Sequence, residues 1–120
     1  MGKNKKFLTK NEFRIDLNPS HMGKDKVAHP AYITGRKGHK FYANGTTHST
    51  YTKHGEPTYD FGENPNKNNA QTDKRKSRIT LPYWQSDKLF SKDKLNNYRY
   101  SNKTRRDIKK FNKKIDKKRQ

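Results

Sequence analysis

The placement of the apolar residues limits what this chain can fold into. Only 26% of its 120 residues are hydrophobic, well below the share in an ordinary globular protein. A chain this polar can bury little apolar surface, and the composition alone is compatible with extensive disorder. The apolar residues nevertheless cluster between Ala31 and Trp84, and both ends of the chain are rich in Lys. We therefore expect one small domain, mainly β (α+β), flanked by basic extensions.

The first extension, residues 1–26, is interpreted as a basic N-terminal arm that contains one short strand. Phe13, Ile15 and Leu17 alternate with polar residues, and a period of two is typical of a half-buried strand. Asn18 and Pro19 then end the pattern, because both residues favour turns.

The domain itself, residues 27–100, is predicted to be a small antiparallel β-meander that closes into a barrel. Asn44-Gly45 is the strongest hairpin signal in the chain, since both residues tolerate the positive φ angles of a tight turn. A polar stretch over 62–76, which has no large apolar side chain, predicts a flexible loop. The strands are expected at 30–34, 39–43, 46–52, 57–61 and 79–84.

Residues 101–120 are predicted to form a basic C-terminal helix. Ser101 or Asn102 can cap its first turn, and Ile108, Phe111 and Ile115 recur at helical spacing along one face. Ten Lys and Arg minus two Asp leave a net charge of +8 on this segment. Like charges four residues apart oppose helix formation, so we expect the helix to form against the domain or against a phosphate backbone.

The charge of the whole chain indicates the class of partner. Thirty Lys and Arg stand against eleven Asp and Glu, a net charge of +19, and such a surplus repels itself in a compact state. Lys and Arg that replace the condensed counterions of a polyanion release those ions, which favours binding. We therefore expect the partner to be a nucleic acid, with RNA favoured over DNA, or a ribonucleoprotein.

The candidate contacts with nucleic acid are basic and aromatic. Lys outnumbers Arg in the C-terminal segment, which favours neutralisation of phosphates over bidentate reading of bases. Aromatic side chains exposed on a sheet can also stack unpaired bases. With so few aliphatic residues, most aromatics are expected in the core, and Tyr42 joins Tyr83 and Trp84 as candidates for stacking. The predicted contact residues are Arg36, Lys74, Arg75, Lys76, Arg78, Tyr83, Trp84, Arg105, Arg106, Lys109, Lys110, Lys113 and Lys114.

The histidines leave catalysis open. The chain has no Cys, and its five His form no recognisable zinc pattern, so neither a metal nor another cofactor is expected. Cleavage of RNA by its own 2′-hydroxyl needs a base, an acid and a donor to the phosphate, and His side chains beside Arg and Thr can supply all three. His29 and His48 are candidates for such a site. The alternative is that they are ordinary surface or hydrogen-bonded histidines.

A resemblance to a known family adds to this hypothesis. The segment 29–33, His-Pro-Ala-Tyr-Ile, followed by Thr-Thr-His-Ser at 46–49, resembles the core of MazF/PemK-like proteins over about residues 27–84. The resemblance implies an SH3-like β-barrel and a metal-independent endoribonuclease activity. The Thr that the family uses falls on Thr47, and the family's Arg falls on His29, which lacks a permanent charge. The candidate catalytic residues are therefore His29, Thr47 and His48.

Three classes of function remain open. A non-enzymatic RNA-binding module is preferred; the second class is the MazF-like endoribonuclease. The third is a ribosomal or mobile-element-encoded protein that binds and modulates a ribonucleoprotein, for example a CRISPR effector. No apolar run approaches the roughly 20 residues that span a bilayer, and the charged start lacks the apolar stretch of a secretory signal. A cytoplasmic location without membrane association is therefore expected.

Overall fold

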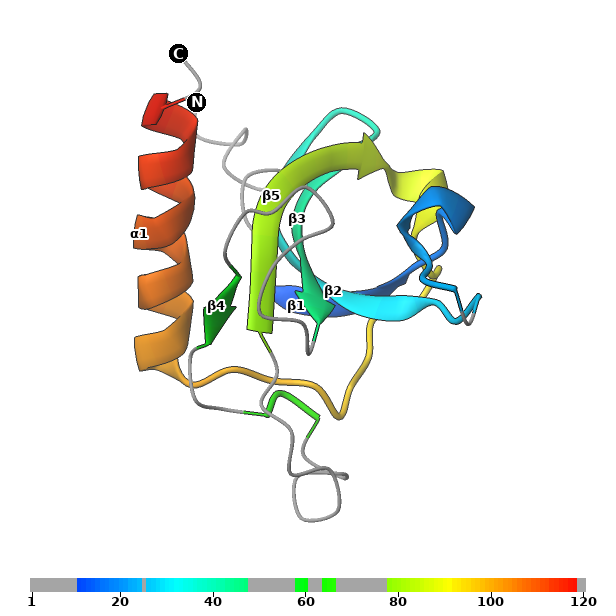
Figure 1. Cartoon of the computed structure of the whole chain (residues 1–120), viewed down its shortest axis with the longest axis horizontal. Coiled ribbons are helices and arrows are strands. Elements are labelled where there is room, and N and C mark those ends of the chain that lie inside the picture. The colour runs from blue at the N-terminus through cyan, green and yellow to red at the C-terminus, as the bar shows by residue number, and fades with distance from the viewer. Residues whose placement is uncertain (1–10, 25, 48–57, 61–63, 67–77, 119–120) are drawn as a thin grey trace.

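The computed structural model describes residues 11–24, 26–47, 58–60, 64–66 and 78–118. These form five strands, one α-helix and two short 3-10 turns, so the predicted mainly-β class with a C-terminal helix is confirmed (Figure 1). The elements are β1 (Glu12–Asp16), η2 (Pro19–His21), β2 (His29–Lys37), β3 (Lys40–Thr47), β4 (Tyr59–Asp60), β5 (Arg78–Ser86), η3 (Asp87–Leu89) and α1 (Asn102–Lys118).

The strands form one antiparallel sheet in the order β1-β2-β3-β5-β4. The predicted meander is therefore wrong, because β5 inserts between β3 and the two-residue β4. The predicted closed barrel is also wrong. The sheet curls strongly (Figure 1), and Leu17 N donates to Leu89 O at 2.8 Å. Within the described residues, however, β1 meets the segment after β5 through the isolated bridge Asp16–Phe90 and not through a further strand. The result is a curled, open sheet.

Asn44-Gly45 lies inside β3 and makes no hairpin, which corrects the strongest turn prediction. Asn44 is fully buried, and its side-chain amide donates to Thr80 O and to Asn112 Oδ1, both at 3.0 Å. A Cβ on Gly45 would stand only 3.0 Å from Thr80 Oγ1, so this glycine permits a close approach of two strands. These tertiary contacts override the local turn preference. The β2–β3 turn lies at Gly38, where φ is 61°, between the strands expected at 30–34 and 39–43.

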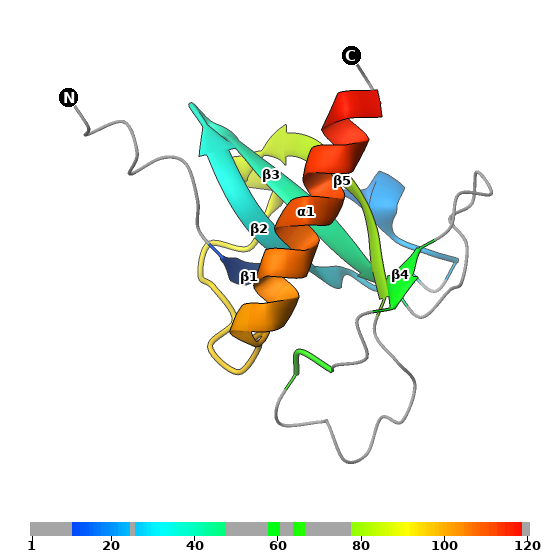
Figure 2. The same ribbon diagram turned by 90° about the vertical axis from the view of Figure 1, so that its left-hand side faces the viewer.

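Both faces of the sheet are covered by apolar side chains. Figure 2 shows α1 lying across one face of the sheet. Aromatic rings supply much of the volume beneath the helix, since aliphatic residues are scarce. The cluster on the helix side contains Phe13, Tyr32, Ile79, Tyr100, Ile108 and Phe111. The second cluster contains Ala31, Ile33, Phe41, Ala43 and Phe90, with Tyr83 packed against it.

A buried pair of amides joins the helix to the middle of the sheet. Asn44 Nδ2 donates to Asn112 Oδ1 at 3.0 Å, and Asn112 Nδ2 donates back to Asn44 Oδ1 at 2.9 Å. Both side chains lie in the interior, where an unpaired amide costs about 1–3 kcal/mol. Only one rotation and one axial position of α1 satisfy both groups, so the pair fixes the register of the helix on the sheet.

Asn112→Leu is expected to lower the free energy of unfolding by about 1–3 kcal/mol, because the buried Oδ1 of Asn44 loses its donor and Nδ2 keeps only Thr80 O as an acceptor. The double variant Asn44→Leu/Asn112→Leu should lose less than the sum of the two single variants. Urea unfolding followed by circular dichroism measures these differences. Lys109→Gln, on the exposed side of the same helix, is the control and should stay within about 0.5 kcal/mol of the wild type. Strictly additive losses would contradict the coupling.

Candidate nucleic-acid interface

The helix α1 is held by its apolar face, as predicted. The Ser101 hydroxyl accepts from Thr104 N at 3.2 Å and caps the first turn. Ile108 and Phe111 are buried, and the ring of Phe111 lies 4.2 Å from that of Tyr59 in β4. Ile115 packs at the edge of the same cluster. The side of the helix that faces the sheet is therefore set by packing.

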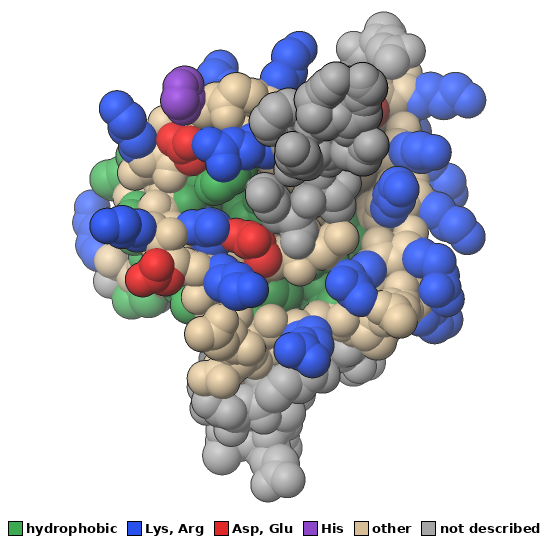
Figure 3. Space-filling view, turned by 180° about the vertical axis from the view of Figure 1, so that it is seen from behind, with side chains coloured by type: hydrophobic (Ala, Val, Ile, Leu, Met, Phe, Trp, Pro, Cys, Tyr) green, Lys and Arg blue, Asp and Glu red, His purple; other side chains and the backbone are tan. Residues whose placement is uncertain are grey.

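The opposite side of α1 is a continuous basic surface. Figure 3 shows a column of Lys and Arg along the edge where α1 lies. One ion pair is made within the helix, from Lys103 Nζ to Asp107 Oδ2 at 2.9 Å, and this hydrogen bond lowers the pKa of Asp107. We call the exposed cations of the helix the α1 basic face: Lys103, Arg106, Lys109, Lys110, Lys113, Lys114, Lys117 and Lys118.

Packing outweighs the repulsion within this face. Each pair of like charges four residues apart, such as Arg106 and Lys110, opposes the helix by about 0.2–0.5 kcal/mol. Burial of a side chain such as Ile108 or Phe111 contributes about 1.5–3 kcal/mol. The helix can therefore keep its cations crowded at the surface. Arg105, also predicted as a contact, is half-buried and donates to the side chain of Asn102.

An exposed aromatic pair lies beside the helix. Trp84 in β5 is 49% exposed and stands opposite Tyr42 in β3. The centroids of the two rings are 4.7 Å apart, with 31° between the ring planes. The Tyr42 hydroxyl donates to the carboxylate of Asp116 near the end of α1. Tyr42 therefore links Trp84 to α1, because it contacts both of them.

Three other predicted contact residues are engaged inside the fold. The Arg36 guanidinium donates to Gly38 O at 2.9 Å and to Asp87 Oδ2 at 3.2 Å. Arg78 donates to the hydroxyl and the carbonyl of Thr58 at 2.7 and 2.8 Å. The Tyr83 hydroxyl donates to Asp16 Oδ2 at 2.6 Å. In this structure the polar groups of these side chains hold strands and turns together.

The candidate catalytic residues are brought together in part. His29 is exposed at the start of β2, and Thr47 ends the neighbouring strand β3. Ala31, two residues after His29, pairs with Gly45, two residues before Thr47, so His29 and Thr47 lie at the same end of the sheet. Thr47 also stands opposite Arg78. His48 and the basic run Lys74, Arg75 and Lys76 lie outside the described residues, as does most of the loop predicted over 62–76.

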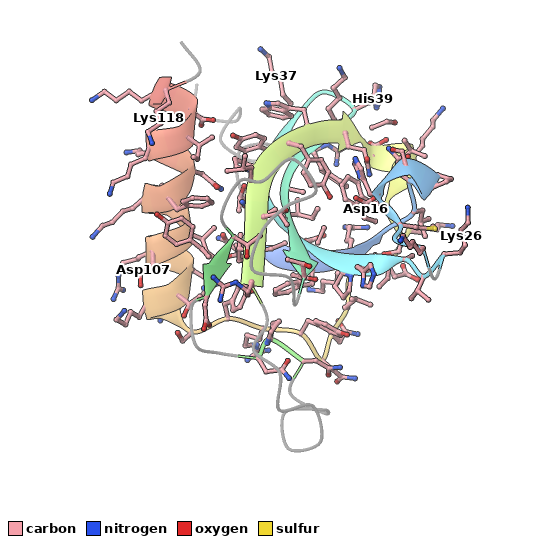
Figure 4. All side chains as sticks on the ribbon, in the orientation of Figure 1. Asp16, Lys26, Lys37, His39, Asp107 and Lys118 are labelled. Carbon is pink, nitrogen blue, oxygen red and sulfur yellow. The ribbon has the colours of Figure 1, made fainter. Side chains whose placement is uncertain are left out.

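A buried polar network around Asp16 was not predicted. Through Oδ2, the Asp16 carboxylate accepts from His21 Nδ1 at 2.7 Å and from the Tyr83 hydroxyl. Through Oδ1, it accepts from Gln85 Nε2 and from the backbone N–H of Asn18, both at 2.9 Å. It lies on the side of the sheet away from α1 (Figure 4). The network ties β1 and η2 to β5. Its residues come from two separate segments of the sequence, 16–21 and 83–85, so no local pattern signals it.

The network changes the acidity of two of its members. Burial raises the pKa of Asp16, but the hydrogen bonds from Tyr83, Gln85, Asn18 and His21 outweigh burial and leave it below its ordinary value. Burial, followed by the hydrogen bond to Asp16, raises the pKa of Tyr83. Asp16 is therefore a charged acceptor and Tyr83 a neutral donor at neutral pH.

No protein-family model, characterised protein or solved structure was found to match the chain. Among the described residues, no three or more His, Cys, Asp or Glu gather as metal ligands would. Within the same residues, no helix has the length and apolar character needed to cross a membrane. The interpretation of the site therefore rests on its own geometry.

Asp16→Asn is expected to destabilise the fold at neutral pH by about 1–3 kcal/mol, because an amide cannot accept all four hydrogen bonds. The pKa of Asp16 is lowered on folding, so its stabilisation is present above the ordinary value of 3.8 and is lost as pH falls through the lower folded value. The difference in the free energy of unfolding between the wild type and the variant should therefore become smaller over that acidic range. Urea unfolding at several pH values tests this, with exposed Asp93→Asn as the control; a gap independent of pH would contradict it.

Proposed function

We propose that this protein binds nucleic acid by neutralising phosphates with the α1 basic face, and that RNA is its preferred partner. The observation that carries the proposal is a helix whose two sides have opposite roles. Ile108, Phe111 and Asn112 are buried against the sheet, while eight Lys and Arg stand exposed on the other side. Because packing fixes one side of the helix against the sheet, the fold holds a dense row of cations on the side that faces solvent.

A phosphate backbone suits this row in both length and chemistry. The 17 residues of α1 span about 25 Å at about 1.5 Å per residue, which is long enough to follow several phosphates. The face is mostly Lys, whose ammonium group is a point charge without a preferred planar partner. Such contacts position a strand without reading its sequence. RNA is favoured because its unpaired bases suit an exposed ring beside the cations.

The triple variant Arg106→Glu/Lys110→Glu/Lys113→Glu is expected to abolish binding to single-stranded RNA at physiological salt. Each phosphate contact contributes about 0.7 to the slope of log K against log salt concentration for a single strand. Loss of the three contacts should therefore reduce that slope by about 2 in low salt, where residual binding is measurable. Fluorescence anisotropy with labelled RNA, across a series of salt concentrations, gives both quantities.

The matched control makes the same change of net charge elsewhere. Lys24, Lys26 and Lys88 are exposed and lie at or beside η2 and η3, on the side of the molecule away from α1 (Figures 1 and 4). Their triple replacement by Glu should lower affinity only modestly, through the general field of the protein. Equal losses in both triple variants would show that net charge alone acts, and would overturn the α1 basic face as the site.

A second candidate function is metal-independent cleavage of RNA, the activity implied by the resemblance to MazF/PemK-like proteins. It is favoured by one observation, the position of His29 and Thr47 at the same end of neighbouring strands. The SH3-like assignment belongs to the same proposal, supported by a small curled antiparallel sheet. Against it, the Arg78 guanidinium donates to Thr58 and forms an ion pair with Asp60, so a fixed cation for the phosphate has to come from elsewhere.

Cleavage predicts shortened RNA on a denaturing gel in the presence of EDTA, from the same samples that are used for binding. His29→Ala and Thr47→Ala should each remove the products while they leave affinity within about twofold, since neither residue belongs to the α1 basic face. Lys92→Ala is the control, because Lys92 is exposed and belongs to neither site. Intact RNA in every sample would exclude this function.

A further inference from the structure

Trp84 is a large aromatic residue that the fold leaves partly exposed. It is the single Trp of the chain, it is 49% exposed, and the strand around it is otherwise well packed. Ile79, Pro82 and Gln85 in the same strand are buried. A large ring left half in water forfeits the apolar burial that would otherwise stabilise the fold. Its exposure therefore leaves a flat apolar surface for a ligand.

Tyr42 and α1 together fix the orientation of the Trp84 ring. Trp84 packs on Tyr42 with ring centroids 4.7 Å apart and 31° between the planes. Tyr42 is itself held by the hydrogen bond from its hydroxyl to Asp116 in α1. We call Trp84 and Tyr42 the aromatic platform. It is preorganised, because the lower ring and the helix hold the upper ring before any ligand arrives.

Cations stand on two sides of the platform. On one side lies the end of α1, where Lys117 and Lys118 are exposed next to Asp116. On the other side is the β2–β3 hairpin, where Lys37 pairs with Lys40, two residues before Tyr42. Figure 4 shows Lys37 and Lys118 extending from the same end of the molecule. A ligand on the platform is thus within reach of positive charge in both directions.

We propose that the aromatic platform stacks an unpaired nucleobase while the neighbouring lysines hold the phosphates on either side, so that the protein prefers single-stranded nucleic acid to duplex. This inference rests on the proposed function. Every base has a π-face that an exposed indole can cover, whereas a duplex hides those faces within its own stack. The α1 basic face attracts both single strands and duplexes, whereas the platform can stack only on a single strand, whose bases are accessible.

Intrinsic fluorescence tests the platform directly, because one Trp reports from one place. The probes are a single-stranded oligouridylate of about ten nucleotides, within the usual site sizes of single-strand binders, and an RNA duplex of the same length. The full-length protein should show quenched Trp emission when it binds the single strand. Binding to the duplex, followed by anisotropy, should leave that emission nearly unchanged.

Trp84→Ala should weaken binding to the single strand about tenfold, the effect expected for the loss of one base–aromatic stack. Its affinity for the duplex should stay within about twofold of the wild type. Trp84→Phe should recover part of the loss, and it replaces the Ala variant if that variant fails a circular dichroism check of its fold. Leu89→Ala, an exposed apolar side chain in η3, is the matched control and should change neither affinity.

The possible failures of the two proposals differ. If the single strand binds without quenching and Trp84→Ala keeps its affinity, the platform is not a base site, while sensitivity to the charge reversals on α1 would still support phosphate binding. If Trp84→Ala weakens single strand and duplex equally, the ring is a general contact and the preference for single strands is overturned. If the wild type binds neither probe, the proposed function fails and this inference fails with it.

Discussion

The contact between α1 and the sheet determines which side of the helix is buried and which side carries the basic face. Ile108 and Phe111 give the contact its strength, and the reciprocal hydrogen bonds of Asn44 and Asn112 give it a single register. If the helix turned by one residue, about 100°, the amides would lose each other and apolar residues would face water. The same rotation would carry lysines into the core, where an unpaired charge is prohibitively costly. The position of the basic face is therefore a consequence of core packing.

A chain with so few aliphatic residues replaces them in two ways. Aromatic rings fill the space beneath α1, where Phe13, Tyr32 and Tyr100 lie within about 5 Å of one another. Satisfied polar groups fill the rest, and Asp16 with its four donors is the clearest case. Polar groups of this kind contribute little net stability when paired and cost much when unpaired. They make the fold specific, and they make it sensitive to single substitutions that would be mild in an apolar core.

Local patterns in the sequence predicted those elements whose signal lies within one stretch of residues. The apolar stripe at Ile108, Phe111 and Ile115 located α1, and alternation located β1. Asn44-Gly45 failed because its burial depends on Asn112, 68 residues away, and no window of the sequence contains both. The order of the strands failed for the same reason. At the candidate site, the exposed lysines of α1 followed from their number, whereas Arg36, Arg78 and Tyr83 form internal contacts that depend on tertiary neighbours such as Asp87, Thr58 and Asp16.

The two parts of the proposed interface respond differently to salt, and this separates their roles. Attraction by the α1 basic face is long-ranged and weakens as the screening length falls from about 10 Å at 0.1 M salt to about 3 Å at 1 M. Stacking on Trp84 depends on contact and desolvation, which salt does not screen. In the proposed interface, the cations would therefore set how fast and how tightly any polyanion is captured. The aromatic platform would select the polyanion that stays bound. The preference for the single strand should therefore survive, and even grow, as salt rises and both affinities fall, because each phosphate contact is less salt-dependent on a single strand than on a duplex.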